Sequence, residues 1–540
     1  MREADLLAPG GPFEMRVETV LGERMRVFKN RPPNLRTWLA DSAQRGDADY
    51  LVFDAPDARR LSYREHLARV ASVARALQER YGVQKGDRVG ILAANCPEWI
   101  LAFWASMSLG ALPVGMNGWW AGDEIRFALS DCQPKVLIAD RKRLARLDGA
   151  DPGMPVITVE EDFRALEEHD LTAALPNVPL DEDDATAILY TSGTSGRSKG
   201  VVHTHRNVIA LVMLQLFHGA RMMRVATPLP ADVQRCSLVS NPLFHVSGLY
   251  TQVVTSLVTG AKTVWTRGRF DPQRVLELIQ QERVTSWSPH GSMGPRVVHH
   301  PDVAKYDLSS VLNLGSGGAP VPRPLQEALR ATFPNASSTL TVGYGLTEGT
   351  ALACIAFGAD LAAHPDSVGR PMPTVELEIR AAGEIYLRGP LIMKEYWNRP
   401  DETAASIKAG RWLRTGDIGR IADDRLYVES RKRDLILRGA ENVSPVEIER
   451  RLEAHPAVRE AAVVGVPHPE LGQEVMAFVV PNGDAPLTAD ALTAWVAQAL
   501  AYFKVPSKWE LRDTPLPRNA SGKLLRRVLT DGGDSGFIED

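Results

Sequence analysis

Short apolar runs alternate with amphipathic helical segments along roughly the first 340 residues, and this alternation most restricts the possible folds. It is typical of a layered α/β architecture. Helices are expected from the capping box at Ser62 and Glu65 and from Asp271-Pro272. Strands are expected at residues 89–92, 136–139, 187–190, 237–239, 263–265, 284–287 and 311–314. We therefore expect an α/β fold with a large N-terminal lobe of layered subdomains.

The pattern changes near residue 370. Val375, Leu377 and Ile379 alternate with charged residues, which predicts a half-exposed strand and a small β-rich section. A charged segment at 430–434 then precedes a compact α+β tail. Its expected elements are a helix from Pro445, strands at 461–466 and 475–480, and a helix at 488–500. The sequence thus predicts two domains, residues 1–431 and residues 432–540.

Composition excludes several classes of protein. The 62 basic and 66 acidic residues give a net charge of −4, so the whole chain has no electrostatic drive toward nucleic acid or anionic membranes. Residues 99–122 are uncharged, but Gly110 and Pro113 interrupt them, so we expect a buried helix and strand and no membrane span. No apolar signal core follows the N-terminus. The cysteines are too dispersed for a disulfide framework, which favours a reducing, cytoplasmic location: Cys96, Cys132, Cys236 and Cys354.

One loop carries the strongest chemical signal. Residues 190–200 read YTSGTSGRSKG after an expected strand, with a helix expected from about Val201. Glycines free the backbone N–H groups, and hydroxyls together with Lys199 can donate to phosphate oxygens. The spacing does not fit a Walker P-loop. The segment therefore predicts a phosphate-binding loop of another kind.

This loop resembles YTSGTTGxPKG of the adenylate-forming superfamily, which comprises acyl-CoA synthetases, luciferases and adenylation domains of peptide synthetases. Ser195 and Ser198 replace Thr and Pro of that pattern. Five further motifs follow in the family's order, and the resemblance extends from about residue 35 to 528. It implies that the ATP phosphates are bound by Thr191, Ser192, Gly193, Thr194, Ser195, Gly196 and Lys199.

The other motifs imply the rest of a nucleotide site. In 343–348, GYGLTE, the resemblance implies that Tyr344 stacks on adenine, Thr347 contacts the α-phosphate and Glu348 holds Mg²⁺. In 415–417, TGD, Asp417 would accept both ribose hydroxyls, and Arg431 would support the ribose. The loop flanking adenine and the acyl pocket would include Gly317, Gly318, Ala319 and Pro320.

The C-terminal motifs imply a mobile domain. Arg433 falls at the family's hinge position, and Lys523, in 517–523, would reach from the small domain into the active site. Gly439 and Ala440 would border the pantetheine tunnel of coenzyme A, and Ala440 replaces a usual glycine, so the tunnel should be narrowed but open. The implied reaction forms an acyl-adenylate from ATP and a carboxylic acid. After the small domain turns, a thiol displaces AMP.

The implied acid is fatty or cyclic. His245, counted among the catalytic residues, stands where amino-acid-activating domains carry an Asp for the substrate ammonium, so amino acids are disfavoured. The chain instead resembles fatty and aryl acyl-CoA synthetases. The expected pocket walls are Val246, Gly248, Trp287, His290, Met293, Gly315 and Gly343, although core packing is an equal alternative for Trp287 and Met293. His290 indicates either a polar group on the substrate or a structural histidine.

Three functions remain open at this level. The leading one is an ATP- and Mg²⁺-dependent acyl-CoA synthetase that uses coenzyme A, an acid–thiol ligase. The second is an adenylating enzyme that loads a carrier protein, and the third is a noncatalytic nucleotide-binding regulator on the same fold. A homodimer is considered for its assembly, and His203, His205, His299 and His300 are interpreted as structural.

Overall fold

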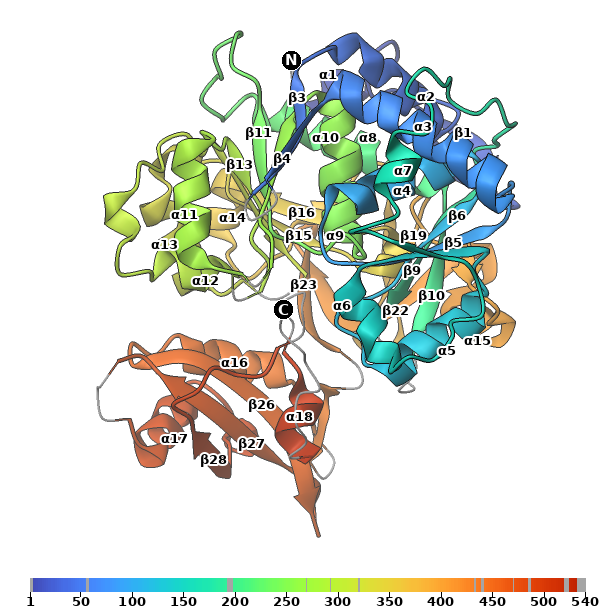
Figure 1. The fold of residues 1–540 in the computed structure, drawn as a ribbon. Coiled ribbons are helices and arrows are strands. Elements are labelled where there is room, and N and C mark those ends of the chain that lie inside the picture. Colours follow the sequence, from blue (N-terminus) through green and yellow to red (C-terminus); the bar gives the residue numbers. More distant parts are fainter. Residues whose placement is uncertain are drawn as a thin grey trace.

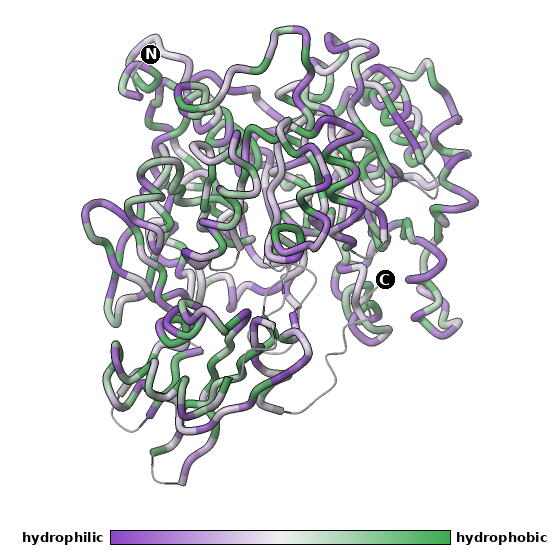
Figure 2. Tube along the Cα trace, turned by 90° about the vertical axis from the view of Figure 1, so that its left-hand side faces the viewer, coloured by the Kyte–Doolittle hydropathy of each residue, from purple (hydrophilic) through white to green (hydrophobic). Residues whose placement is uncertain are grey.

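The computed structural model describes residues 3–531 except 55–57, 192–197, 269, 292, 319–320, 432–433, 439–440, 470, 484–486 and 519–523. Figure 1 shows a large N-terminal domain and, below it in orange and red, a small C-terminal domain. Figure 2, turned by 90°, again shows the small domain as a separate lobe below the large one. The predicted α/β fold with a large and a small domain is confirmed.

Two sheets organise the part of the large domain that the structure describes. The first has the order β20 (Glu395–Tyr396), β10 (Lys199–Thr204), β9 (Ala185–Thr191), β6 (Leu112–Gly115), β5 (Arg88–Leu92), β7 (Val136–Ala139), β8 (Val156–Thr158). The second has the order β17 (Arg370–Pro371), β16 (Cys354–Phe357), β15 (Thr341–Tyr344), β14 (Asn313–Gly317), β13 (Ser286–Trp287), β11 (Cys236–Val239), β12 (Lys262–Trp265), β3 (Asp49–Phe53), β4 (Arg59–Ser62). Every strand expected in the first 340 residues overlaps one of these strands.

Helices pack on these sheets where the sequence predicts them. Helix α3 (Tyr63–Tyr81) begins at the expected capping box, in which Ser62 accepts from the Glu65 amide. Helix α11 (Pro272–Gln281) begins after Asp271, whose side chain accepts from the Gln273 amide. The uncharged stretch forms helix α4 (Pro97–Ser108), buried almost throughout, and strand β6. Among the described residues, the helices are too short or too polar to cross a membrane.

The segment after the phosphate loop differs from the prediction. Residues Lys199–Thr204 form strand β10 between β9 and β20, and helix α8 (His205–Met222) begins only afterwards. The β-branched Val201 and Val202 are buried in this strand, where their stiff side chains pack well. Thr204 ends the strand and caps the helix by accepting from the Asn207 amide at 3.2 Å.

Of two further sheets, one belongs to the large domain and the other to the small domain. The β-rich section has the order β18 (Glu376–Ile379), β19 (Glu384–Arg388), β22 (Trp412–Ala422), β21 (Ile407–Lys408), and β23 (Arg425–Arg431) pairs with β22. The small domain has the order β25 (Glu441–Val443), β24 (Ile436–Arg438), β27 (Gly472–Pro481), β26 (Val458–His468), with β28 (Lys508–Leu511) on β27 and helices α16 (Pro445–Glu453) and α17 (Ala489–Ala497). The chain changes sheet between β23 and β24; the exact boundary after residue 431 stays a prediction.

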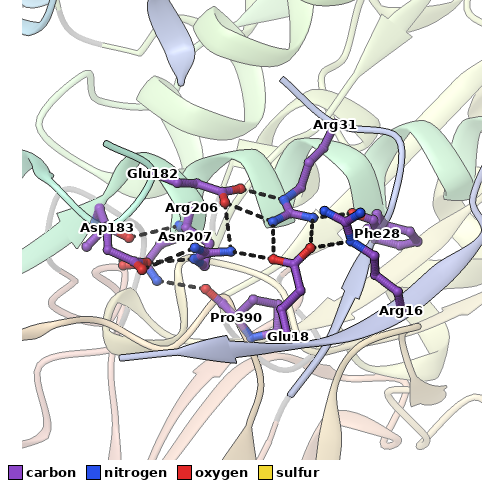
Figure 3. Close-up of polar contacts among 10 residues, drawn as sticks. Arg16, Glu18, Phe28, Arg31, Glu182, Asp183, Arg206, Asn207 and Pro390 are labelled. Carbon is purple, nitrogen blue, oxygen red and sulfur yellow. Dashed lines mark hydrogen bonds and ion pairs between the residues drawn. The ribbon is translucent and has the colours of Figure 1, made fainter. Parts of the chain in front are cut away.

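An ion-pair cluster fastens the N-terminal hairpin of β1 (Met15–Val20) and β2 (Glu23–Phe28) to helix α8 (Figure 3). The Arg31 guanidinium donates to Glu18 at 2.7 Å and to Glu182 at 2.8 Å, and Arg206 of α8 also pairs with Glu182 at 2.7 Å. The hydrogen bond from Arg31 lowers the pKa of Glu18 to about 2. The Arg31 side chain is only 9% exposed, so this link is largely shielded from solvent.

Candidate active site

A cavity of about 1200 Å³ lies between helix α8 and the second sheet. One end is lined by Lys199, Thr347, Glu348 and Arg431, which come from motifs far apart in the sequence. The other end reaches Met223, which is 70% exposed. Strands β14 and β15 are parallel, and their carboxyl ends lead into the loops that line the motif end. This is the place where open α/β sheets bind ligands.

A buried histidine supports Thr347. The Thr347 carbonyl can only accept, so His203 Nε2, 2.8 Å away, carries the proton. His203 Nδ1 then accepts from the Tyr250 hydroxyl at 3.2 Å. Burial lowers the pKa of His203 to about 4, so the ring is neutral at pH 7. His203 is therefore structural, as expected, and it fixes the backbone of the expected phosphate-contacting residue.

Glu348 and Lys199 share an aromatic neighbour. The Tyr396 hydroxyl donates to Glu348 Oε1 at 2.8 Å, and the Lys199 ammonium lies 5.1 Å from the centroid of the Tyr396 ring. Lys199 also forms an ion pair with Glu402. The expected metal-binding carboxylate and the expected phosphate-binding ammonium are thus held at one end of the cavity.

The residues expected to bind adenine and ribose form a second cluster. The Tyr344 hydroxyl donates to Asp417 Oδ2 at 2.8 Å, and Arg431 Nε lies 3.0 Å from Asp417 Oδ1. The Asp417 side chain is only 5% exposed. Burial and the nearby carboxylate raise the pKa of Tyr344, so its hydroxyl stays protonated. Asp417 lies within strand β22 after Gly416, whose φ of +74° favours glycine.

Close contacts explain two glycines of the cavity wall, one against a side chain and one against the backbone. A Cβ on Gly315 would lie 2.6 Å from Ser288 Oγ, and one on Gly317 would lie 2.9 Å from the Gly343 carbonyl oxygen. His290 lies beside this turn, because a Cβ on Gly318 would be 3.4 Å from its ring. Its Nδ1 is 3.1 Å from the Ser288 carbonyl oxygen, and burial lowers its pKa.

The expected acyl-pocket residues separate into two groups. The cavity is lined by Val246, His290, Gly315 and Gly343, and also by His245, which was expected among the catalytic residues. Trp287 instead points to the other side of the sheet, where it is 1% exposed and lies 5.9 Å from Phe333, so it packs in the core. Met293 lines a different cavity. Gly248 is a tight-turn residue, because a Cβ there would lie 2.2 Å from the Pro242 carbonyl oxygen.

That second cavity, of about 1570 Å³, lies between the two domains. Tyr344, Asp417 and Arg431 line it from the large domain, and Arg450 and Arg518 from the small domain. It therefore meets the first cavity at the nucleotide end, where both include Arg431. Outside the described residues lie the expected Ser192, Gly193, Thr194, Ser195, Gly196, Ala319, Pro320, Arg433, Gly439, Ala440 and Lys523.

Comparison with known proteins identifies the family. The model of AMP-binding enzymes matches residues 39–397, and that of the AMP-binding enzyme C-terminal domain matches residues 447–523. The chain belongs to the AMP-binding enzymes. This confirms the predicted adenylate-forming family and the predicted enzyme class, an acid–thiol ligase.

Relatives of this AMP-binding enzyme are CoA ligases. A feruloyl-CoA synthase of Amycolatopsis sp is 33% identical over 479 residues, covering 86% of this chain and 92% of the relative. A long-chain-fatty-acid–CoA ligase of Mycobacterium tuberculosis (strain ATCC 25618 / H37Rv) is 33% identical over 469 residues, covering 83% and 89%. The crystal structure of ATP-bound MatB from Rhodopseudomonas palustris is similar with a TM-score of 0.81 at 26% identity, covering 93% of this chain and 98% of that one.

Several residues of the site were not identified from the sequence. Tyr396 and Glu402 carry no motif of their own, and Tyr396 reaches Glu348 only because the two-residue strand β20 pairs with β10. His245 indicated the acyl side of the site, but nothing local linked Tyr250 to His203. These contacts depend on sheet order, which residue periodicity does not encode.

Proposed function

We propose that this AMP-binding enzyme is an ATP-dependent acyl-CoA synthetase for a fatty or cyclic carboxylic acid. The proposal rests mainly on one observation: motif residues that are far apart in the sequence, between 191 and 431, line one cavity that is large enough for an acid beside a nucleotide. The second cavity connects this point to the small domain next to the Lys523 motif. The relatives are named for feruloyl-CoA and long-chain acyl-CoA formation, which supports the reaction but leaves the acid open.

In the first half-reaction a carboxylate oxygen of the acid attacks the α-phosphorus of ATP, and the bond to pyrophosphate breaks. Lys199 and the 191–196 loop would bind the leaving phosphates, which requires Lys199 to exchange Glu402 for phosphate oxygens. Thr347, held by His203, would contact the α-phosphate. Lys523 would bridge the carboxylate and the α-phosphate. One such preorganised donor contributes about 3–4 kcal/mol to lowering a barrier.

The site suits Mg²⁺ held jointly by protein and nucleotide. The described residues contain no cluster of three or more His, Cys, Asp or Glu side chains that could hold a metal by themselves. Mg²⁺ commonly binds through one or two carboxylates plus substrate phosphates, and Glu348 supplies one carboxylate at the nucleotide end. When bound, Mg²⁺ would neutralise charge on the leaving pyrophosphate. The Tyr396 hydroxyl would orient the Glu348 carboxylate.

In the second half-reaction the sulfur of coenzyme A attacks the acyl carbon, and the bond to AMP breaks. We propose that residues 432–540 rotate about Arg433, withdraw Lys523 and present Gly439 and Ala440 to the pantetheine. Tyr344 would meanwhile retain adenine, and Asp417 with Arg431 the ribose. Rebuilding the site between steps also keeps water from the reactive acyl-adenylate.

The test is AMP release by purified protein with ATP, Mg²⁺ and a panel of straight-chain, aromatic and alicyclic acids, with and without coenzyme A. The proposal expects acid-dependent AMP release that requires coenzyme A, with the thioester detected by mass. Accumulation of acyl-adenylate without thioester would indicate that the acceptor is a carrier protein and not coenzyme A. An absence of turnover with every acid would refute the proposal and favour a nucleotide-binding regulator.

A further inference from the structure

Three neighbouring strands in the middle of the second sheet present polar side chains to the cavity. Ser237 of β11 is in register with Ser286 of β13, and Ser286 with Asn313 of β14, so the three side chains form one row across the sheet. All three line the cavity, and none is fully buried. Their side chains make no hydrogen bond with any residue in the described part of the chain.

This row is unusual for its position. Central parallel strands are normally apolar on both faces, because both faces are covered. The opposite face here follows that rule, since Leu238 and Trp287 are at most 2% exposed and pack in one apolar cluster. The polar face is therefore confined to the cavity side, where hydroxyl and amide groups are left available to a ligand.

The facing wall also carries polar side chains, beside Met222 and Met223. The Gln215 side chain of α8 accepts a hydrogen bond from the Thr255 hydroxyl and donates a long one, 3.4 Å, to the Thr251 carbonyl. Because a side-chain amide can donate two hydrogen bonds and accept two, Gln215 can still donate to and accept from a ligand. His218, one turn along α8, lies 3.3 Å from the Thr341 hydroxyl. Burial lowers the pKa of His218 to about 3, so the ring is neutral at pH 7.

Between the two ends of the cavity, uncharged polar groups thus lie among apolar side chains such as Leu312, Leu352 and Ile355. The charged residues that line the cavity lie at its ends: Lys199, Glu348, Glu384, Glu402, Arg414 and Arg431 with the nucleotide motifs, and Arg235 with the outer loop. A second carboxylate or an ammonium group on the acid would find no charged partner in the middle among the residues that the structure describes. A plain alkyl chain could pack on the apolar side chains of the cavity, but it would also displace water from the serine, asparagine and glutamine groups without replacing the lost hydrogen bonds, which is costly.

We infer that the acid bears neutral oxygen functions, hydroxyl or keto, on its body, and that Gln215 and Ser286 determine this specificity from opposite walls. The inference rests on the proposed function, because it assigns this cavity to the acyl group. Polar sites of this kind discriminate strongly: a site built to hydrogen-bond a substrate oxygen rejects the analogue that lacks it far better than an apolar pocket rejects an added hydroxyl.

The experiment compares acids that share a carbon skeleton and differ only in their oxygen function, in two series. 3-Cyclohexylpropanoic acid is set against its 4-hydroxy and 4-oxo derivatives, and a decalin carboxylic acid against its hydroxy and oxo derivatives. Two readouts are used: kcat/KM from AMP release with coenzyme A, and direct binding by titration calorimetry. We expect the oxygenated member of at least one pair to be preferred about tenfold or more in both readouts, as one or two hydrogen bonds would give.

The variants locate the recognition. Gln215→Leu should reduce the preference for the oxygenated acid about fivefold or more, since one lost hydrogen bond has this effect. Binding of the hydrocarbon acid should not become weaker. The Thr255 hydroxyl keeps the Tyr250 carbonyl, 3.1 Å away, as a partner, so the fold should survive. Ser286→Ala should act in the same direction from the other wall. Gln78→Leu, the same change on the exposed face of α3, is the matched control and should leave the preference unaltered.

The two proposals can fail separately. Preferred binding of an oxygenated acid without any thioester would overturn the synthetase function and keep the inference on the acid. Equal or better binding of the hydrocarbon acids, or no binding of any oxygenated acid, would overturn the inference, whatever the turnover. It would also be overturned if Gln215→Leu and Ser286→Ala weakened both members of each pair equally.

Discussion

The assignment of the ribose site can be tested by Asp417→Asn. Asp417 is buried between the Tyr344 hydroxyl at 2.8 Å and Arg431 at 3.0 Å, and it is proposed to accept both ribose hydroxyls. Asparagine keeps the shape and one acceptor oxygen. Its NH₂ group can donate to the Tyr344 oxygen, because a phenol hydroxyl also accepts. The substitution therefore removes charge with little change in packing.

The expected magnitude follows from the loss of charge. A hydrogen bond to a charged group contributes about 1.5–3 kcal/mol and a neutral one about 0.5–1.5 kcal/mol, so each ribose bond weakens by about 1 kcal/mol. Two bonds give about 2 kcal/mol, or roughly a 30-fold rise in the dissociation constant of ATP. The acid is not contacted by Asp417, so its binding should be unchanged.

The assay is a thermodynamic cycle in which the protein and the nucleotide are each changed, singly and together. ATP and 2′,3′-dideoxy-ATP are titrated against the wild type and Asp417→Asn, and the coupling energy isolates the interaction between carboxylate and hydroxyls. Dideoxy-ATP should bind the two proteins with nearly equal affinity. Asp423→Asn serves as control, because Asp423 lies in the β22–β23 turn at φ +50°, which asparagine tolerates. Equal losses for both nucleotides would refute the ribose assignment and leave Asp417 as a partner of Tyr344 and Arg431 only within the protein.

Three further predictions concern other parts of the chain. Lys523→Ala should suppress adenylation but preserve thioester formation from supplied acyl-adenylate, and Arg433→Pro should do the reverse; equal loss of both half-reactions in both variants would contradict domain alternation. Arg31→Met should lower the opening free energy of the β1–β2 hairpin by about 1–3 kcal/mol, because two largely buried carboxylates lose a partner, and hydrogen exchange of the hairpin amides measures this. His66 is fully buried, its ring nitrogens have no hydrogen-bond partner among the described residues, and burial lowers its pKa to about 3. Its neutral form is favoured in the fold, so stability is lost as pH falls from 6.5 toward 3, and at pH 5 this loss reaches about 2 kcal/mol. His66→Phe should remove that loss, and melting curves at pH 7.5 and pH 5 would contradict the reasoning if both proteins shifted equally.

The sequence predicted the architecture well where the signal is local. The short strands and the capped helices from Ser62 and Asp271 were found where periodicity and capping placed them. The segment at 199–204 was wrongly predicted as helix, because its valines are held in a strand by β9 and β20, which lie beside it only in space. Pairing between distant segments can override a local pattern.

The site was predicted unevenly for the same reason. Tyr344, Thr347, Glu348 and Asp417 could be singled out because they belong to motifs. Trp287 illustrates the limit: its neighbour Ser286 faces the cavity while Trp287 faces the core, and a two-residue strand does not reveal which face is covered. Which face of this strand is covered depends on the sheet order and on the helix packed on the opposite wall.

The cavity has two ends, and this affects how ligands reach it. Its outer end lies at the exposed Met223 and Arg235, away from Thr347. An acid can therefore enter or leave without passing a bound nucleotide, so the fold permits ATP and acid to add in either order. An acid whose body extends beyond the outer end can still place its carboxyl group beside Thr347, so the size of the acid has no strict upper limit there.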